Sequence, residues 1–191
     1  MQTRTVFNTP IVRGFFRLMF ITLTWLRGWE VVGEKPSHKK YILIAAPHSS
    51  NWDFPTMMGA AFVLGLDVHW IGKHTLFPKG VVGFVMRWFG GISIDRRKTN
   101  NTVDQIIEQY ALRDDLLVLI APEGTRSKVD NWKAGFYHIA VGAGVPIYLA
   151  FLDTKKRQTG IGKVFYPSGN YEKDLAEIKS FYSDKVGFNP E

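Results

Sequence analysis

Beyond Gly33, short apolar runs alternate with longer stretches of helical periodicity. Strands of the kind that are buried on both faces are predicted at 41–46, 68–71, 116–121 and 146–152. Helices are predicted between and after them, at 54–66, 76–88, 102–112, 132–141 and, with alternating charges on a solvated surface, 171–188. This alternation predicts an α/β fold: a mainly parallel central sheet with helices on both faces, and ligands at the carboxyl ends of its strands.

The segment before Gly33 places aromatic and aliphatic residues between arginines. Its longest uncharged stretch, 18–26, is less than half of the ~20 residues that a helix needs to cross a bilayer. As a helix over 11–27, it collects polar residues within an arc of roughly 80°: Arg13, Arg17, Thr24 and Arg27. The opposite side is apolar: Phe15, Leu18, Met19, Trp25 and Leu26.

This pattern predicts an interfacial amphipathic helix within residues 1–30 that precedes the α/β domain at 31–191. Its membrane contacts would be Arg13, Arg17, Trp25 and Arg27, giving a monotopic attachment rather than a crossing. The alternative is an amphipathic helix that packs on its own domain. Phe20 lies within the basic arc and fits neither interpretation well.

Composition narrows the possible classes of function. With 46% hydrophobic and 21% charged residues in 191, the chain is expected to fold as one globular domain. The absence of cysteine excludes a disulfide scaffold, a thiolate metal site and a cysteine nucleophile. The net charge of +7 favours an anionic partner: a membrane, a phosphorylated substrate or a nucleic acid. Nucleic acid ranks last, because the basic residues are spread along the chain and no motif for it is present.

His48 and Asp53 are the candidate catalytic pair. His48 follows the strand at 41–46, and Asp53 stands where the next helix begins. Residues five apart on one helix point roughly 140° away from each other, so the two meet only across a turn, which 49–51 favours. A carboxylate on one ring nitrogen would leave the other free to act as a general base. The spacing fits equally well an Asp53 that caps the helix beside a structural His48.

A second polar group follows the strand at 116–121. Gly124 allows a ligand close to the backbone, Thr125 offers a hydroxyl, and Arg126 offers a planar fork that matches phosphate. Arg96 follows another short apolar strand and would join Arg126 at the same end of the sheet to hold a phosphate group. No His-Glu-x-x-His metal motif and no Gly-x-Ser-x-Gly nucleophile elbow occurs, so we expect no metal site and no serine esterase.

Four sequence blocks in this order resemble those of the glycerolipid acyltransferases, the family of 1-acylglycerol-3-phosphate O-acyltransferase. They are His48-x4-Asp53, 90–96, 122–126 and 145–147, and the resemblance covers residues 31–150. Lys73 with Leu76 resembles the family's Lys-x-x-Leu, and Lys133 with Gly135 its Lys-x-Gly. The resemblance makes residues 31–191 the acyltransferase domain.

The resemblance implies transfer of a fatty acyl group from coenzyme A or acyl carrier protein to the hydroxyl of a lysophospholipid, first of all 1-acylglycerol-3-phosphate. His48 would be the general base and Asp53 its partner, with no metal, no further cofactor and no acyl-enzyme. The substrate-binding residues would be Lys73, Arg96, Glu123, Gly124, Thr125 and Arg126.

It also implies a peripheral protein on the cytoplasmic face of a membrane. The acceptor, the chain length, the donor and the oligomeric state stay open. The alternative is a non-enzymatic module that binds anionic lipid, in which His48 and Asp53 would be replaceable.

Overall fold

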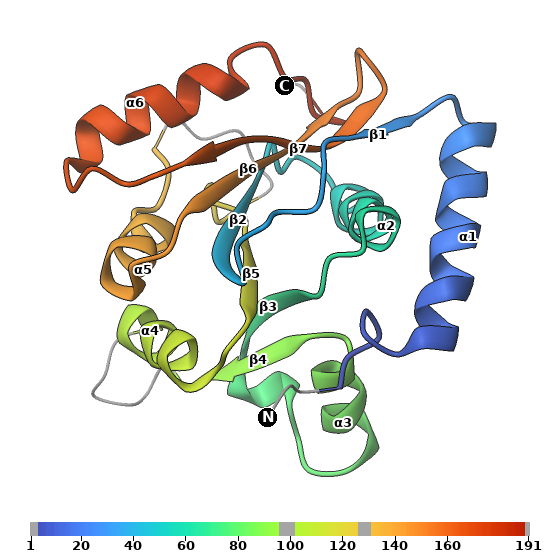
Figure 1. The fold of residues 1–191 in the computed structure, drawn as a ribbon, viewed down its shortest axis with the longest axis horizontal. Coiled ribbons are helices and arrows are strands. Elements are labelled where there is room, and N and C mark those ends of the chain that lie inside the picture. The colour runs from blue at the N-terminus through green and yellow to red at the C-terminus, as the bar shows by residue number, and fades with distance from the viewer. Residues whose placement is uncertain (1–3, 96–101, 126–130, 190–191) are drawn as a thin grey trace.

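Across residues 4–95, 102–125 and 131–189, which the computed structural model describes, the chain forms one sheet in the strand order β1-β7-β6-β2-β5-β3-β4 (Figure 1). The strands are β1 (Glu30–Val32), β2 (Lys40–Ala46), β3 (Val68–Lys73), β4 (Gly91–Ile94), β5 (Leu116–Ile120), β6 (Ile147–Asp153) and β7 (Gln158–Phe165). Strands β6, β2, β5, β3 and β4 are parallel, so their carboxyl ends share one edge. Strand β7 runs antiparallel to β6 and pairs with β1. The predicted α/β class is confirmed.

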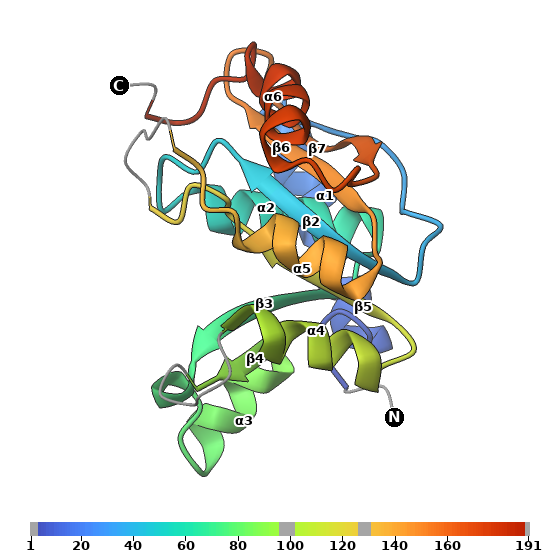
Figure 2. The ribbon, with the colours of Figure 1, turned by 90° about the vertical axis from the view of Figure 1, so that its left-hand side faces the viewer.

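Helices cover both faces of the sheet. They are α1 (Pro10–Leu26), α2 (Asp53–Leu64), α3 (Val81–Trp88), α4 (Thr102–Leu112), α5 (Gly135–Ala143) and α6 (Tyr171–Tyr182), with a short 3-10 helix, η1 (His74–Leu76). In Figure 1, α4, α5 and α6 lie on the left of the sheet and α1 and α2 on its right. In Figure 2, α4 and α5 lie in front of the sheet.

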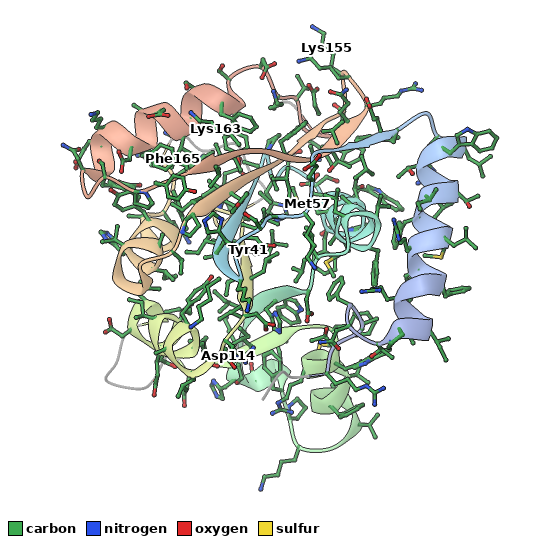
Figure 3. The ribbon with its side chains drawn as sticks, viewed as in Figure 1. Tyr41, Met57, Asp114, Lys155, Lys163 and Phe165 are labelled. Carbon is green, nitrogen blue, oxygen red and sulfur yellow. The ribbon has the colours of Figure 1, made fainter. Side chains whose placement is uncertain are left out.

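The central strand β2 shows why its sequence is apolar without interruption. Ile42 and Ile44 belong to the core on the α4, α5 and α6 side, whereas Tyr41 and Leu43 belong to the core on the α2 side. Both faces of the strand are therefore buried, which favours a continuous apolar run. Figure 3 labels Tyr41 and Met57 on the α2 side and Phe165 on the opposite side.

Helix α1 has one packed face and one exposed face. Phe16 and Phe20 stack on Phe62 of α2, with ring centroids 5.0 and 5.9 Å apart. Phe20 therefore packs inward beside the arginines. The outer face exposes between 65% and 87% of five apolar residues: Ile11, Phe15, Leu18, Trp25 and Leu26. Met19, predicted on that outer face, is half-buried.

The predicted N-terminal amphipathic helix is confirmed, while the division of the chain at residue 30 stays a prediction. Within the described ranges, no helix combines the length and the hydropathy that a membrane crossing requires.

Four elements differ from the sequence prediction. Strands β1 and β7 were not predicted, because β1 has three residues and β7 mixes glycine and polar residues into its pattern. Helix α3 begins at Val81 rather than at 76, after η1 and Pro78. Helix α6 ends at Tyr182 and is not merely solvated: Ile178 is fully buried. The hydroxyl of Tyr182 donates to the carbonyl of Ala150, 3.0 Å away, which ties α6 to β6.

Candidate active site

His48 and Asp53 meet just beyond the carboxyl end of β2. His48 Nδ1 lies 3.1 Å from Asp53 Oδ2, and the side chains are 26% and 0% exposed. The chain turns between them, so the pair forms although the two residues are five apart. Because Nδ1 faces a carboxylate, it carries a proton, and Nε2 is left as the acceptor. A partly exposed histidine in this state can accept a proton from a bound hydroxyl.

The turn between the pair is held by Asp53 itself. The N–H groups of Ser49 and Ser50 donate to Asp53 Oδ2 over 2.6 and 2.7 Å. Both amides precede α2, so Asp53 stabilises the turn that carries His48, rather than the first turn of the helix. The fully buried carboxylate thereby fixes both the ring and the backbone of the loop at 47–52, here called the catalytic loop.

Glu123 reaches the catalytic loop from the turn that follows β5, the strand beside β2. The backbone N–H of His48 donates to Glu123 Oε2 over 2.7 Å. Burial raises the pKa of Glu123, and the nearby charge of Asp53 also raises it, while the His48 N–H acts in the opposite direction. Sequence reasoning placed Glu123 in the substrate site, whereas its described contact is to the backbone of the proposed base.

Gly124 and Lys133 lie together next to Glu123. Gly124 has φ +67°, and a Cβ there would stand 2.8 Å from Lys133 Nζ. The N–H of Lys133 donates to the carbonyl of Pro122 over 2.8 Å. A cation therefore stands at the edge of the sheet where a phosphate was expected. In the sequence, Lys133 was noted only for its Lys-x-Gly motif, and its position against Gly124 adds it to the candidate site.

The structure describes two of the other predicted substrate-binding residues and leaves two outside the described ranges. Lys73 ends β3 at the carboxyl edge of the sheet and is exposed. Thr125 is exposed beyond Gly124. Arg96 and Arg126 lie outside the described residues, so their proposed roles remain predictions. Among the residues that the structure does describe, no group of three or more His, Asp or Glu side chains could hold a metal ion.

An apolar groove of about 570 Å³ adjoins the catalytic loop. Trp52, which stands between His48 and Asp53 in the chain, forms part of its wall and is 66% exposed. The lining comes from α1, α2 and two distant segments: Phe20, Leu23, Thr24, Arg27, Trp29, Trp52, Pro55, Thr56 and Phe188. The structure thus places a mainly apolar groove next to the loop that carries His48.

Comparison with known proteins identifies the family of the chain. A family model described as Acyltransferase matches residues 28–150, which include the catalytic loop and Glu123. The chain belongs to the acyltransferase family. The predicted resemblance is therefore confirmed.

Individual acyltransferases show how far the likeness extends. Human 1-acyl-sn-glycerol-3-phosphate acyltransferase beta is 31% identical over 188 residues, which cover 91% of this chain and 63% of that protein. The 1-acyl-sn-glycerol-3-phosphate acyltransferase of Haemophilus influenzae is 29% identical over 150 residues, which cover 74% of this chain and 61% of that protein. The chain thus spans less than two thirds of the length of these relatives.

A solved acyltransferase structure shares the fold. The crystal structure of the 1-acyl-sn-glycerophosphate (LPA) acyltransferase PlsC from Thermotoga maritima matches with a TM-score of 0.60 at 21% sequence identity. The match covers 89% of this chain and 76% of that one.

Proposed function

We propose that this acyltransferase transfers a fatty acyl group from an acyl thioester, of coenzyme A or of acyl carrier protein, to the hydroxyl of 1-acylglycerol-3-phosphate. One observation carries the proposal: His48 and Asp53 pair at 3.1 Å, inside the segment that matches the acyltransferase family. The acceptor is suggested by the names of the relatives, which are 1-acyl-sn-glycerol-3-phosphate acyltransferases.

His48 acts as the general base in the proposed reaction. Its Nε2 takes the proton of the acceptor hydroxyl while that oxygen attacks the thioester carbonyl carbon. Asp53, 3.1 Å from Nδ1, stabilises the imidazolium that forms. When the tetrahedral intermediate collapses, the carbon–sulfur bond breaks and the proton passes from His48 to the leaving thiolate. The products are an ester and a free thiol, so the step needs no acyl-enzyme and no redox partner.

The acceptor phosphate binds at the cationic edge of the sheet. Lys73 and Lys133 are two described cations at that edge, and Arg96 and Arg126 join them on the family resemblance. Opposite charges at a partly desolvated site would position the acceptor hydroxyl toward His48.

The apolar groove beside Trp52 takes an aliphatic chain of one substrate. A wall dominated by aromatic and aliphatic side chains suits a fatty acyl group, and the loop position of Trp52 brings the groove next to the reacting atoms.

Helix α1 attaches the protein to the cytoplasmic face of a membrane without crossing it. Its outer face exposes Trp25 and Phe15, while Arg13, Arg17 and Arg27 are exposed along the same helix to meet anionic headgroups. This face also supports the second candidate, a non-enzymatic module that binds anionic lipid.

One assay separates the two candidates. Purified protein is mixed with anionic vesicles, lysophospholipids and either acyl-coenzyme A or acyl carrier protein, in parallel with His48→Ala and the control His138→Ala, an exposed histidine on α5. We expect product from the parent and the control, and about 10²–10⁴-fold less from His48→Ala. Equal turnover by His48→Ala refutes the proposed base. Vesicle binding without turnover by any protein favours the lipid-binding module.

A further inference from the structure

Residues 186–189, here called the C-terminal strap, contact the catalytic loop, and Figure 2 shows the chain end from which they come. Asn189 is joined to Ser49 of that loop by two hydrogen bonds. Its backbone N–H donates to Ser49 Oγ over 3.1 Å, and its side-chain Nδ2 donates to the Ser49 carbonyl over 2.9 Å. A segment remote in sequence from the family's four blocks therefore binds the first of them.

The strap is anchored on its other side by the turn between β6 and β7. The N–H of Thr154 donates to the Val186 carbonyl over 2.8 Å, and Thr154 Oγ1 lies 3.0 Å from the carbonyl oxygens of Val186 and Gly187. At Gly187 the strap lies so close to the loop that a larger residue would clash, because a Cβ there would stand 2.4 Å from Ser49 Oγ. The strap is thus held between a fixed turn and the catalytic loop.

Ser49 connects the strap to the catalytic pair. Its N–H donates to Asp53 Oδ2 over 2.6 Å, while its carbonyl and hydroxyl oxygens accept from Asn189. Each polar group of Ser49 is therefore engaged, and a continuous path runs from Asn189 through Ser49 to Asp53 and His48. Phe188, which precedes Asn189 in the strap, packs on Trp29 in the wall of the apolar groove, with the ring centroids 5.8 Å apart.

From these contacts we infer that the C-terminal strap positions the His48–Asp53 pair, and that Asn189 is its positioning residue. The inference rests on the proposed acyl transfer. Asn189 touches neither His48 nor Asp53, so it acts by fixing the amide of Ser49 that holds the carboxylate. A small displacement of a catalytic group lowers turnover by up to about 100-fold, whereas removal of the Asn189 side chain leaves Phe188 in the groove wall. Loss of the Asn189 side chain should therefore lower kcat rather than raise KM.

The test compares Asn189→Ala with Gln109→Ala, which removes another amide side chain, on α4, that accepts a hydrogen bond from Arg113. Steady-state acyl transfer, thermal unfolding and amide hydrogen exchange at Ser49 and Ser50 are measured in the full chain. For Asn189→Ala we expect a kcat about 10-fold lower at unchanged KM and Tm, with about 10-fold faster exchange of both amides. Gln109→Ala should match the parent in each measurement.

Two results overturn the inference. One is exchange at Ser49 and Ser50 that equals the parent's, which would mean that the strap does not order the loop. The other is a kcat that falls only as far as the folded fraction falls, which would make the strap's role purely structural. A parent that transfers no acyl group refutes the proposed function instead, and hydrogen exchange still decides whether the strap holds the loop.

Discussion

Replacing Glu123 separates a positioning role from a substrate-binding role. Family resemblance assigned this residue to the acceptor site, yet its carboxylate lies 2.7 Å from the backbone N–H of His48. In Glu123→Ala that N–H loses its acceptor. In Glu123→Gln an amide oxygen can still accept the same hydrogen bond, so only the charge is lost.

The expected loss of kcat follows from the strength of the hydrogen bond between the His48 N–H and the Glu123 carboxylate. A hydrogen bond to a charged group contributes about 1.5–3 kcal/mol, and the half-buried position of Glu123 places it near the lower end. Because about 1.4 kcal/mol corresponds to a factor of ten in rate, misplacement of His48 by Glu123→Ala should lower kcat about 10-fold. Glu123→Gln should stay within about 3-fold of the parent, since it retains an acceptor.

Steady-state acyl transfer with varied acceptor at saturating donor measures both parameters. The control is Glu108→Ala, an exposed carboxylate on α4, which should change neither. An increase in the KM for the acceptor at constant kcat, equal in Glu123→Ala and Glu123→Gln, would refute the reasoning and return Glu123 to the substrate site.

Further predictions concern stability and the membrane. Although burial acts to raise the pKa of Asp174, hydrogen bonds from neighbouring side chains and a backbone amide outweigh it and lower the pKa from 3.8. The carboxylate therefore adds stability above about pH 4 that is lost as the pH falls through the folded-state pKa. Thermal unfolding should show a lower Tm for Asp174→Asn than for the parent at pH 7, and this difference in Tm should narrow below about pH 4. A difference in Tm that does not change with pH would contradict this. Phe62→Ala removes the ring that packs against Phe16 and Phe20, and should cost about 3–5 kcal/mol in urea unfolding, whereas a loss below about 1 kcal/mol would contradict this packing. Phe15→Ser combined with Trp25→Ser should weaken vesicle binding in sedimentation without lowering the Tm, because both side chains are exposed; unchanged binding would exclude this face as the membrane contact.

The parts of the fold that the sequence pattern predicts are those buried on both faces. Strand β2 reads as an apolar run because α2 covers Leu43 and α5 covers Ile44. Strand β7 lies next to the sheet edge, with Lys163 exposed, so its pattern carries too little apolar signal. In helix α6 the buried Ile178 is surrounded in sequence by charged residues. The helix packs on the assembled sheet, which cannot be inferred from the local sequence pattern.

The candidate site likewise combines contacts that local sequence suggests with contacts that depend on the whole fold. The turn-forming segment between His48 and Asp53 allowed their contact but equally allowed a helix-capping Asp53, and the family resemblance favoured the pair. The bond from His48 to Glu123 could not, because it depends on β5 pairing with β2, and strand order is a property of the whole fold. The contact of Asn189 with Ser49 joins residues 140 positions apart and has no motif.

The central claim is that His48 and Asp53 act as one catalytic unit. The most direct test is a double-mutant cycle on kcat with His48→Ala, Asp53→Asn and the double variant, in vesicles that bind all four proteins equally. If Asp53 acts through the imidazole 3.1 Å away, the double variant will be about as slow as His48→Ala alone, because the effects of residues in one unit do not add. If the two losses multiply in the double variant, the residues act independently and the account is wrong.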